Sequence, residues 1–174
     1  MLSGSTAVHS DMIMWHYEES VEIAALQFLN ILFSVPQVSV RQADVPAAHR
    51  DMVAFWVDYW LRNRSVLLDG AFTAEAPLAN YPVVRASSEG VEIIARYQDH
   101  VVDLGGDGQR RIDIVNATRN TAVIMRAAQD LGSYHATVTD ARGTVVDSFS
   151  IDLAPGLRSM TVPVSGTVSL ARRR

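Results

Sequence analysis

The feature that most constrains the fold is a change in hydrophobic periodicity after Asn80. Beyond it, apolar and polar residues alternate in short runs, separated by turns rich in glycine, aspartate and asparagine. Short strands at regular spacing with such turns are typical of an antiparallel sandwich or barrel. The sequence therefore predicts an antiparallel β-sandwich over 80–174. A turn at 164–167 leads into its last strand, and the earlier runs lie near 81–86, 91–97, 100–104, 111–116, 120–127, 133–139, 144–151 and 157–164.

The first 70 residues are helix-rich instead. Over 18–32, apolar residues recur at three- and four-residue spacing, which predicts a helix that is hydrophobic on nearly every side. A second helix is predicted over 47–64, after a proline-containing start signal at 44–46. In this helix Trp56 and Trp60 are four residues apart, which favours a buried seam over a platform for stacking sugars.

Two short extended segments flank the first predicted helix. Residues 6–15 mix β-compatible and polar side chains and fit a short strand that ends in a loop. From Val38 onward the pattern alternates, and the preceding Pro36 favours a sheet edge or a strand start. We therefore divide the chain into a helix-rich part over 1–70, a linker over 71–79 and the sandwich over 80–174.

Composition fits a soluble globular chain and argues against several classes of partner. Hydrophobic residues make up 48% of the chain and charged residues 20%. There is no apolar run long enough to span a membrane and no signal-peptide pattern, so we expect a cytoplasmic protein. A net charge of −4 gives no electrostatic reason to expect nucleic acid or an anionic membrane. The absence of cysteine excludes disulfides and thiolate metal sites.

The residues with the greatest chemical potential gather in the segment 8–16, which holds a carboxylate, two histidines and an indole. From the residues alone, Asp11 is either a capping side chain or a general acid/base. His9, His16 and Glu18 do not have the spacing of a compact metal motif. We therefore expect no metal site and no cofactor.

Three stretches together resemble the C-terminal end of the α-galactosidase-like, or melibiase-type, glycoside hydrolases. They are Val8-His9-Ser10-Asp11-Met12-Ile13-Met14-Trp15, then 24–37, which ends in Phe33-Ser34-Val35-Pro36-Gln37, and then 49–68. In that family a (β/α)8 barrel is followed by a small antiparallel β-sandwich. The resemblance covers the chain in order and is more specific over 8–68 than over 80–174. It implies that the helix-rich part is a remnant of such a barrel.

The resemblance also implies a retaining hydrolysis of terminal α-galactosides by two carboxylates. Asp11, in the motif Asp-x-x-x-Trp, matches the acid/base residue, and Trp15 and His9 are candidates for substrate binding. The family's nucleophile lies on an earlier barrel strand, and no residue of this chain matches it. A complete barrel takes at least about 200 residues. Only about 70 precede the β-rich part, so we expect the chain to be inactive alone.

A second hypothesis is a non-catalytic β-sandwich module that binds carbohydrate or mediates oligomerisation. The absence of tryptophan from the β-rich part favours a structural role; its aromatic residues are Tyr81, Tyr97, Tyr134 and Phe149. The two predicted helices have apolar faces that a full barrel would cover. We therefore expect a homo-oligomer with the helical segment at its interface.

Overall fold

The computed structural model describes residues 8–10, 12–41, 43–105 and 108–173 and is mainly β. Its helices are α1 (Val21–Leu29), α2 (Ala47–Asp69) and a short 3₁₀ turn, η1 (Pro77–Ala79). Its strands are β1 (Ala71–Ala74), β2 (Val83–Ser88), β3 (Val91–Arg96), β4 (Val102–Leu104), β5 (Arg111–Asn116), β6 (Ala122–Ala127), β7 (Ser133–Thr139), β8 (Val145–Asp152), β9 (Gly156–Thr161) and β10 (Thr167–Arg172).

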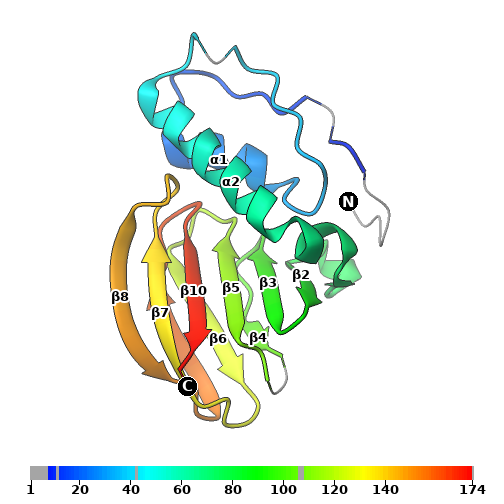
Figure 1. The fold of residues 1–174 in the computed structure, drawn as a ribbon, viewed down its shortest axis with the longest axis vertical. Helices are drawn as coiled ribbons and strands as arrows, with labels where there is room; N and C mark the ends of the chain where they lie inside the picture. The colour runs from blue at the N-terminus through cyan, green and yellow to red at the C-terminus, as the bar shows by residue number, and fades with distance from the viewer. Residues whose placement is uncertain (1–7, 11, 42, 106–107, 174) are drawn as a thin grey trace.

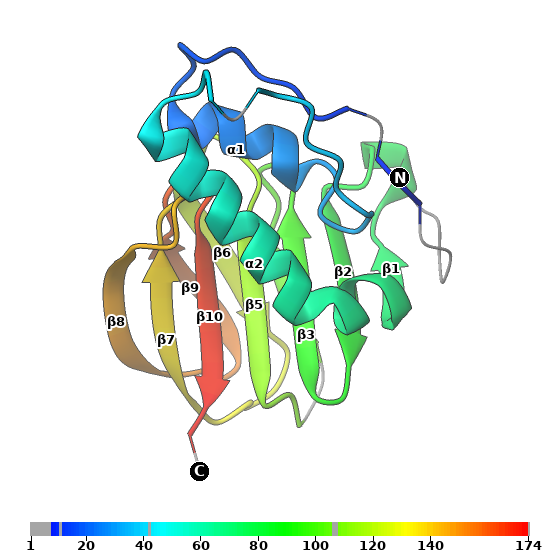
Figure 2. The ribbon, with the colours of Figure 1, turned by 45° about the horizontal axis from the view of Figure 1, so that its top comes forward.

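The strands form two sheets that are stacked face to face. The large sheet has the order β1-β2-β3-β5-β10-β7-β8, and the small sheet has the order β4-β6-β9. Helices α1 and α2 lie on the face of the large sheet opposite the small sheet. The extended chain around 8–10, 12–13 and 35–38 lies beyond the helices (Figures 1 and 2). The layers are therefore extended chain, helices, large sheet and small sheet.

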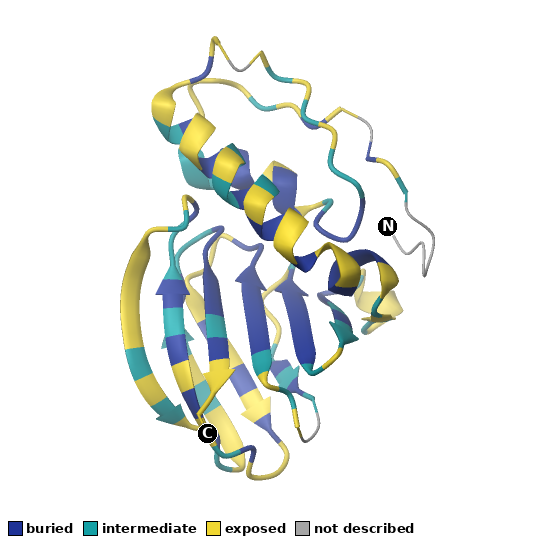
Figure 3. Ribbon diagram, in the orientation of Figure 1, coloured by how far each residue is buried: buried dark blue, intermediate teal, exposed yellow. Residues whose placement is uncertain are grey.

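Two hydrophobic cores lie on opposite sides of the large sheet. Successive side chains of a strand point to opposite faces, so Ile93 packs toward the helices and Ile94 packs toward the small sheet. Strand β3 is consequently buried along its whole length (Figure 3). Trp56 and Trp60 are 0% and 6% exposed in the helix-side core, which confirms that they form a buried seam.

The mainly β class is confirmed, but the fully antiparallel arrangement is wrong. β3 pairs with β5 in parallel, and β4 pairs with β6 in parallel. Between β3 and β5 the chain crosses to the small sheet to form β4, and a crossover of this kind is what lets two strands run in the same direction. Alternation in a sequence sets which face a side chain occupies. It does not set the direction of the neighbouring strand.

The predicted helices exist, with different ends. α1 is shorter than 18–32, because Ser20 caps its start by accepting a hydrogen bond from the backbone of Ile23. α2 begins at Ala47 as predicted but continues to Asp69, since its last turn is buried against the sheet through Val66, Leu67 and Leu68. The predicted linker over 71–79 contains strand β1, which pairs with β2, and the turn η1.

Candidate functional site

The extended segments that flank α1 run parallel to each other. Two bridges join them, His9 to Val35 and Ile13 to Val38, with backbone hydrogen bonds of 2.8 to 3.1 Å. Two parallel extended segments joined by a helix make a βαβ unit, and α2 follows as its second helix. The bridges are four residues apart on the first segment and three apart on the second, so the first carries one extra residue, as in a bulge.

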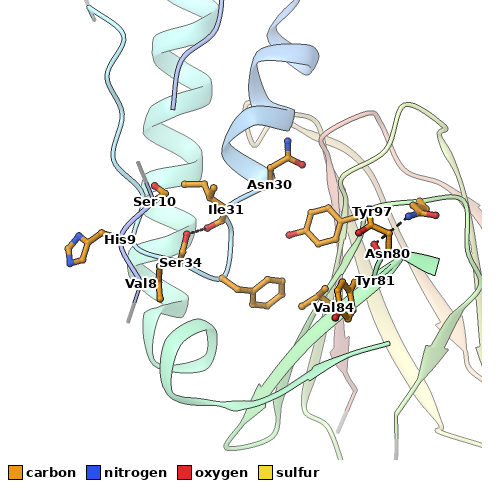
Figure 4. A pocket seen from close by; sticks show the side chains of 12 residues that line it. Val8, His9, Ser10, Asn30, Ile31, Ser34, Asn80, Tyr81, Val84 and Tyr97 are labelled. Carbon is orange, nitrogen blue, oxygen red and sulfur yellow. Dashed lines mark hydrogen bonds between the residues drawn. The ribbon is translucent and has the colours of Figure 1, made fainter. Parts of the chain in front are cut away.

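The structure places two of the three predicted site residues, because Asp11 lies outside the described residues. His9 is exposed, its Nδ1 lies 3.5 Å from Nε2 of Gln37, and its ring points away from the neighbouring cavity (Figure 4). Trp15 is half-buried near the start of α2. The hydrogen-bond partners of the two side chains lie on different elements, Gln37 on the second extended segment for His9 and His49 on α2 for Trp15. The structure does not bring these two side chains together.

Trp15 is held by His49, in the first turn of α2. The indole Nε1 donates to Nδ1 of His49 at 3.0 Å, and Nε2 of His49 lies 3.0 Å from the carbonyl oxygen of Glu19. An indole N–H can only donate, so Nδ1 accepts and the imidazole proton is on Nε2, which donates to Glu19. Because Trp15 and His49 are far apart in the sequence, their pairing could not be read from local spacing.

The other titratable groups of the N-terminal segment are exposed and loosely associated. Nδ1 of His16 lies 3.9 Å from a carboxylate oxygen of Glu18, and the imidazole stacks on the ring of Tyr17. Within the described ranges, no three histidine, cysteine, aspartate or glutamate side chains come together as a metal site requires.

A cavity of about 580 Å³ opens between the βαβ unit and the sandwich (Figure 4). It lies beside the N-terminal ends of the parallel segments, whereas Trp15 follows the C-terminal end of the first. The cavity and Trp15 are therefore at opposite ends of the unit, whereas Val8, His9 and Ser10 of the candidate catalytic segment line the cavity. Its lining residues are Val8, His9, Ser10, Asn30, Ile31, Phe33, Ser34, Asn80, Tyr81, Val84, Tyr97 and Gln98.

Some of the polar side chains around the cavity are used to build its walls. The Tyr97 hydroxyl donates to the carbonyl oxygen of Leu29 at 2.9 Å and so ties β3 to α1. Burial raises the pKa of the Tyr97 phenol well above its usual range, which keeps this donor protonated. Nε2 of Gln98 donates to the carbonyl oxygen of Ala79 at 2.9 Å and holds the loop before β2.

A buried polar network joins α2 to the large sheet. The Tyr59 hydroxyl donates to Oδ2 of Asp113 at 2.9 Å, and the Ser169 hydroxyl donates to Oδ1 at 2.7 Å. Arg111 lies 3.4 Å from the same carboxylate and also bonds the side-chain oxygen of Asn63. Burial raises the pKa of Tyr59 above its usual value, and the Asp113 carboxylate raises it further. Because every member has a partner within the protein, we assign this network to structure.

Sequence reasoning missed the cavity, because four distant stretches of chain form it. The one local signal was Asn80-Tyr81, at the point where the periodicity changes. The helices of the described residues include none that is both long and apolar enough to cross a membrane. Comparison with known proteins found no match to a family model, a curated protein or a solved structure.

Proposed function

We propose that the chain is the C-terminal part of a cytoplasmic α-galactosidase-like glycoside hydrolase. In this proposal residues 8–69 supply the last βαβα unit of a (β/α)8 barrel, and the sandwich supports that unit from outside. The observation that carries the proposal is the parallel pairing of the two segments that flank α1. Parallel strands joined by helices on one side are the repeating unit of such a barrel.

The uncovered face of the parallel pair supports the same interpretation. Ile13 is buried toward the helices, whereas Met12 and Met14 on either side of it are each 61% exposed. In a closed barrel, the strand face away from the helices is filled by bulky side chains from neighbouring strands. Exposed apolar side chains on this face are therefore what a barrel segment would present when seen by itself.

The proposed chemistry is a retaining double displacement. Asp11 would act as the general acid/base in the complete enzyme, while a second carboxylate about 5–5.5 Å away, from an earlier strand, attacks the anomeric carbon. Trp15 lies just after the strand, at the C-terminal end of the unit, where barrel enzymes place their active sites. It remains a candidate for substrate binding, with its indole N–H already committed to His49. The chain alone would be inactive, because it has no residue for the second role.

The first experiment concerns the gene and the complete enzyme. The coding DNA directly upstream of Met1 should contain an in-frame region for the earlier barrel strands. In the enzyme expressed from that longer frame, Asp11→Asn should lower kcat for an aryl α-galactoside at least about 100-fold. A stop codon directly upstream would contradict the proposal. So would turnover by the 174-residue chain that Asp11→Asn abolishes, since the chain would then be active alone.

We also propose a homo-oligomer, although the apolar helix faces that suggested it are buried within the chain. The apolar faces of α1 and α2 are covered by the large sheet and by the extended segments of the same chain. The exposed apolar side chains nearest to them are Met12, Met14, Tyr17 and Leu61. We keep self-association as a proposal and place the contact on this surface. Light scattering tests it, and a monomer at all accessible concentrations would count against it.

The alternative function is a non-catalytic module for carbohydrate binding. The observation that favours it is the cavity between the βαβ unit and the sandwich, which Tyr81 and Tyr97 help to line. The side chains that line this cavity determine which ligand it could bind, whether or not the chain has a catalytic role.

A further inference from the structure

The cavity contains polar side chains that the described part of the chain leaves without a hydrogen-bond partner. They are Asn30, Asn80 and Tyr81. Asn30 lies on one wall, and Asn80 and Tyr81 lie on the opposite wall (Figure 4). Each asparagine amide offers two donors and one acceptor oxygen, and the tyrosine hydroxyl can donate or accept. These groups can therefore bind a ligand without disturbing the walls.

The charge of the lining indicates a neutral ligand. Among the described residues that line it there is no aspartate, glutamate, lysine or arginine, and the ring of His9 points outward. Helix α1 ends at this wall with Asn30 as its C-cap, and the C-terminal end of a helix carries partial negative charge. A phosphate or carboxylate would meet that negative end without a cation to offset it. An organic cation would meet no carboxylate from the part of the lining that the structure describes.

The shape and the aromatic lining suit a sugar ring. About 580 Å³ is within the usual size of small-molecule sites. Tyr81 is half-buried, so part of its ring is available for contact with the C–H face of a pyranose. Asn80 and Tyr81 also adopt left-handed backbone conformations in succession, with φ of 57° and 54°. Such conformations are costly for residues other than glycine and recur where a side chain must be presented to a ligand.

We propose that this cavity binds the ring of a neutral monosaccharide. The ring stacks on Tyr81, and its hydroxyl groups bond to the amides of Asn30 and Asn80. The site lies at the other end of the parallel pair from Trp15. The proposal rests on the alternative function, carbohydrate binding, and does not depend on the glycosidase proposal.

Saturation-transfer NMR on the full 174-residue chain tests this, with methyl α-D-galactopyranoside and methyl α-D-glucopyranoside as probes. Tyr81→Ala should weaken binding by about tenfold, through loss of the stacking surface. Asn30→Ala should weaken it several-fold, through loss of a hydrogen bond. Tyr81→Phe keeps the ring and should retain most of the binding. Tyr17→Ala is the matched control, because this tyrosine is 53% exposed and does not line the cavity.

Thermal unfolding of each variant verifies that it is folded, and Asn30→Ala and Tyr81→Phe keep the test decisive if Tyr81→Ala does not fold. Binding of neither sugar would overturn the proposal. So would weakening by Trp15→Phe equal to that by Tyr81→Ala, because the sugar would then occupy the catalytic end. Failure of the gene and kcat experiments would leave these results unchanged, so the two proposals fail separately.

Discussion

The two cores on either side of the large sheet are built from different chemistry. The core between the sheets consists of aliphatic side chains such as Ile94 and Ile114, together with Tyr134. The core beneath the helices holds large aromatic rings and is crossed by polar links, among them Tyr59 to Asp113 and Trp60 to the carbonyl oxygen of Ser34. Aliphatic packing is nondirectional, whereas a hydrogen bond fixes position and angle. Polar links also join the two sheets, because Arg96 donates to the carbonyl oxygen of Ala122 and Asn116 donates to that of Val162. The two cores therefore differ chiefly in that the helix-side core is built on aromatic rings, two of which make the polar links.

The largest expected effect is on the helix-side core. Trp56 is fully buried between α1 and the sheet, so Trp56→Ala should lower the free energy of unfolding by about 3–5 kcal/mol. Its Nε1 is buried without an acceptor among the described residues, so Trp56→Phe loses volume but no hydrogen bond and should cost about 1–2 kcal/mol. Urea denaturation measures both. Equal losses in the two variants would show that the ring does not fill this core.

Next in size is a cavity in the core between the sheets. Ile114→Ala should lower the free energy of unfolding by about 2–5 kcal/mol, and Ile114→Val by about 0.5–1.5 kcal/mol. Because the truncation of Ile114 removes no titratable group, the loss should be nearly the same at pH 7 and pH 10.5. Denaturation at the two pH values measures it, and a pH-dependent loss would remove the contrast between the cores.

A smaller loss of stability at neutral pH is expected when the hydrogen bond between Tyr59 and Asp113 is removed. Tyr59→Phe removes the hydrogen bond to Asp113 and should cost about 1 kcal/mol. Above pH about 10 an unfolded tyrosine loses its proton while folded Tyr59, with its raised pKa, keeps it. Stability therefore falls as pH rises, by up to about 1.4 kcal/mol per pH unit for this group. Urea denaturation from pH 9 to pH 11.5 should show a shallower fall in Tyr59→Phe, with Tyr17→Phe as the exposed control. Parallel curves would refute the link.

The smallest expected effect is on the outermost layer. Trp15→Phe leaves Nδ1 of the buried His49 without its donor and should cost about 0.5–1.5 kcal/mol. Since Trp15 holds the N-terminal segment to α2, amide exchange of Ile13 should quicken while that of β3 stays unchanged. Equal quickening in both places would mean that the layers open together, so that the outer segment has no separate stability.

Local pattern was enough to find most elements but not their arrangement. The alternating runs gave strands such as Ser133–Thr139 at their observed bounds, because each strand has one face toward a core. The end of α2 was missed because Arg62 and Arg64 fit the last turn of a helix, whereas the helix continues through the buried residues Val66, Leu67 and Leu68. The cavity was missed because Asn30 and Asn80, which are far apart in the sequence, line it together only in the folded protein. Long-range polar contacts produce no periodic pattern in the sequence.

The position of β10 has a consequence for how the protein is made. It is the last strand of the sequence, yet it pairs with β5 on one side and β7 on the other, in the middle of the large sheet. During synthesis on the ribosome, β5 and β7 each therefore have one unpaired edge until residues 167–172 emerge. An unpaired strand edge can pair with another chain and so promotes aggregation. One hydrogen bond to α1 also forms late, because the Ser165 hydroxyl, which precedes β10, donates to the carbonyl oxygen of Glu22 at 2.6 Å. The nascent chain thus depends on β10 to close the sheet, because no other strand pairs with these edges of β5 and β7 in the described structure.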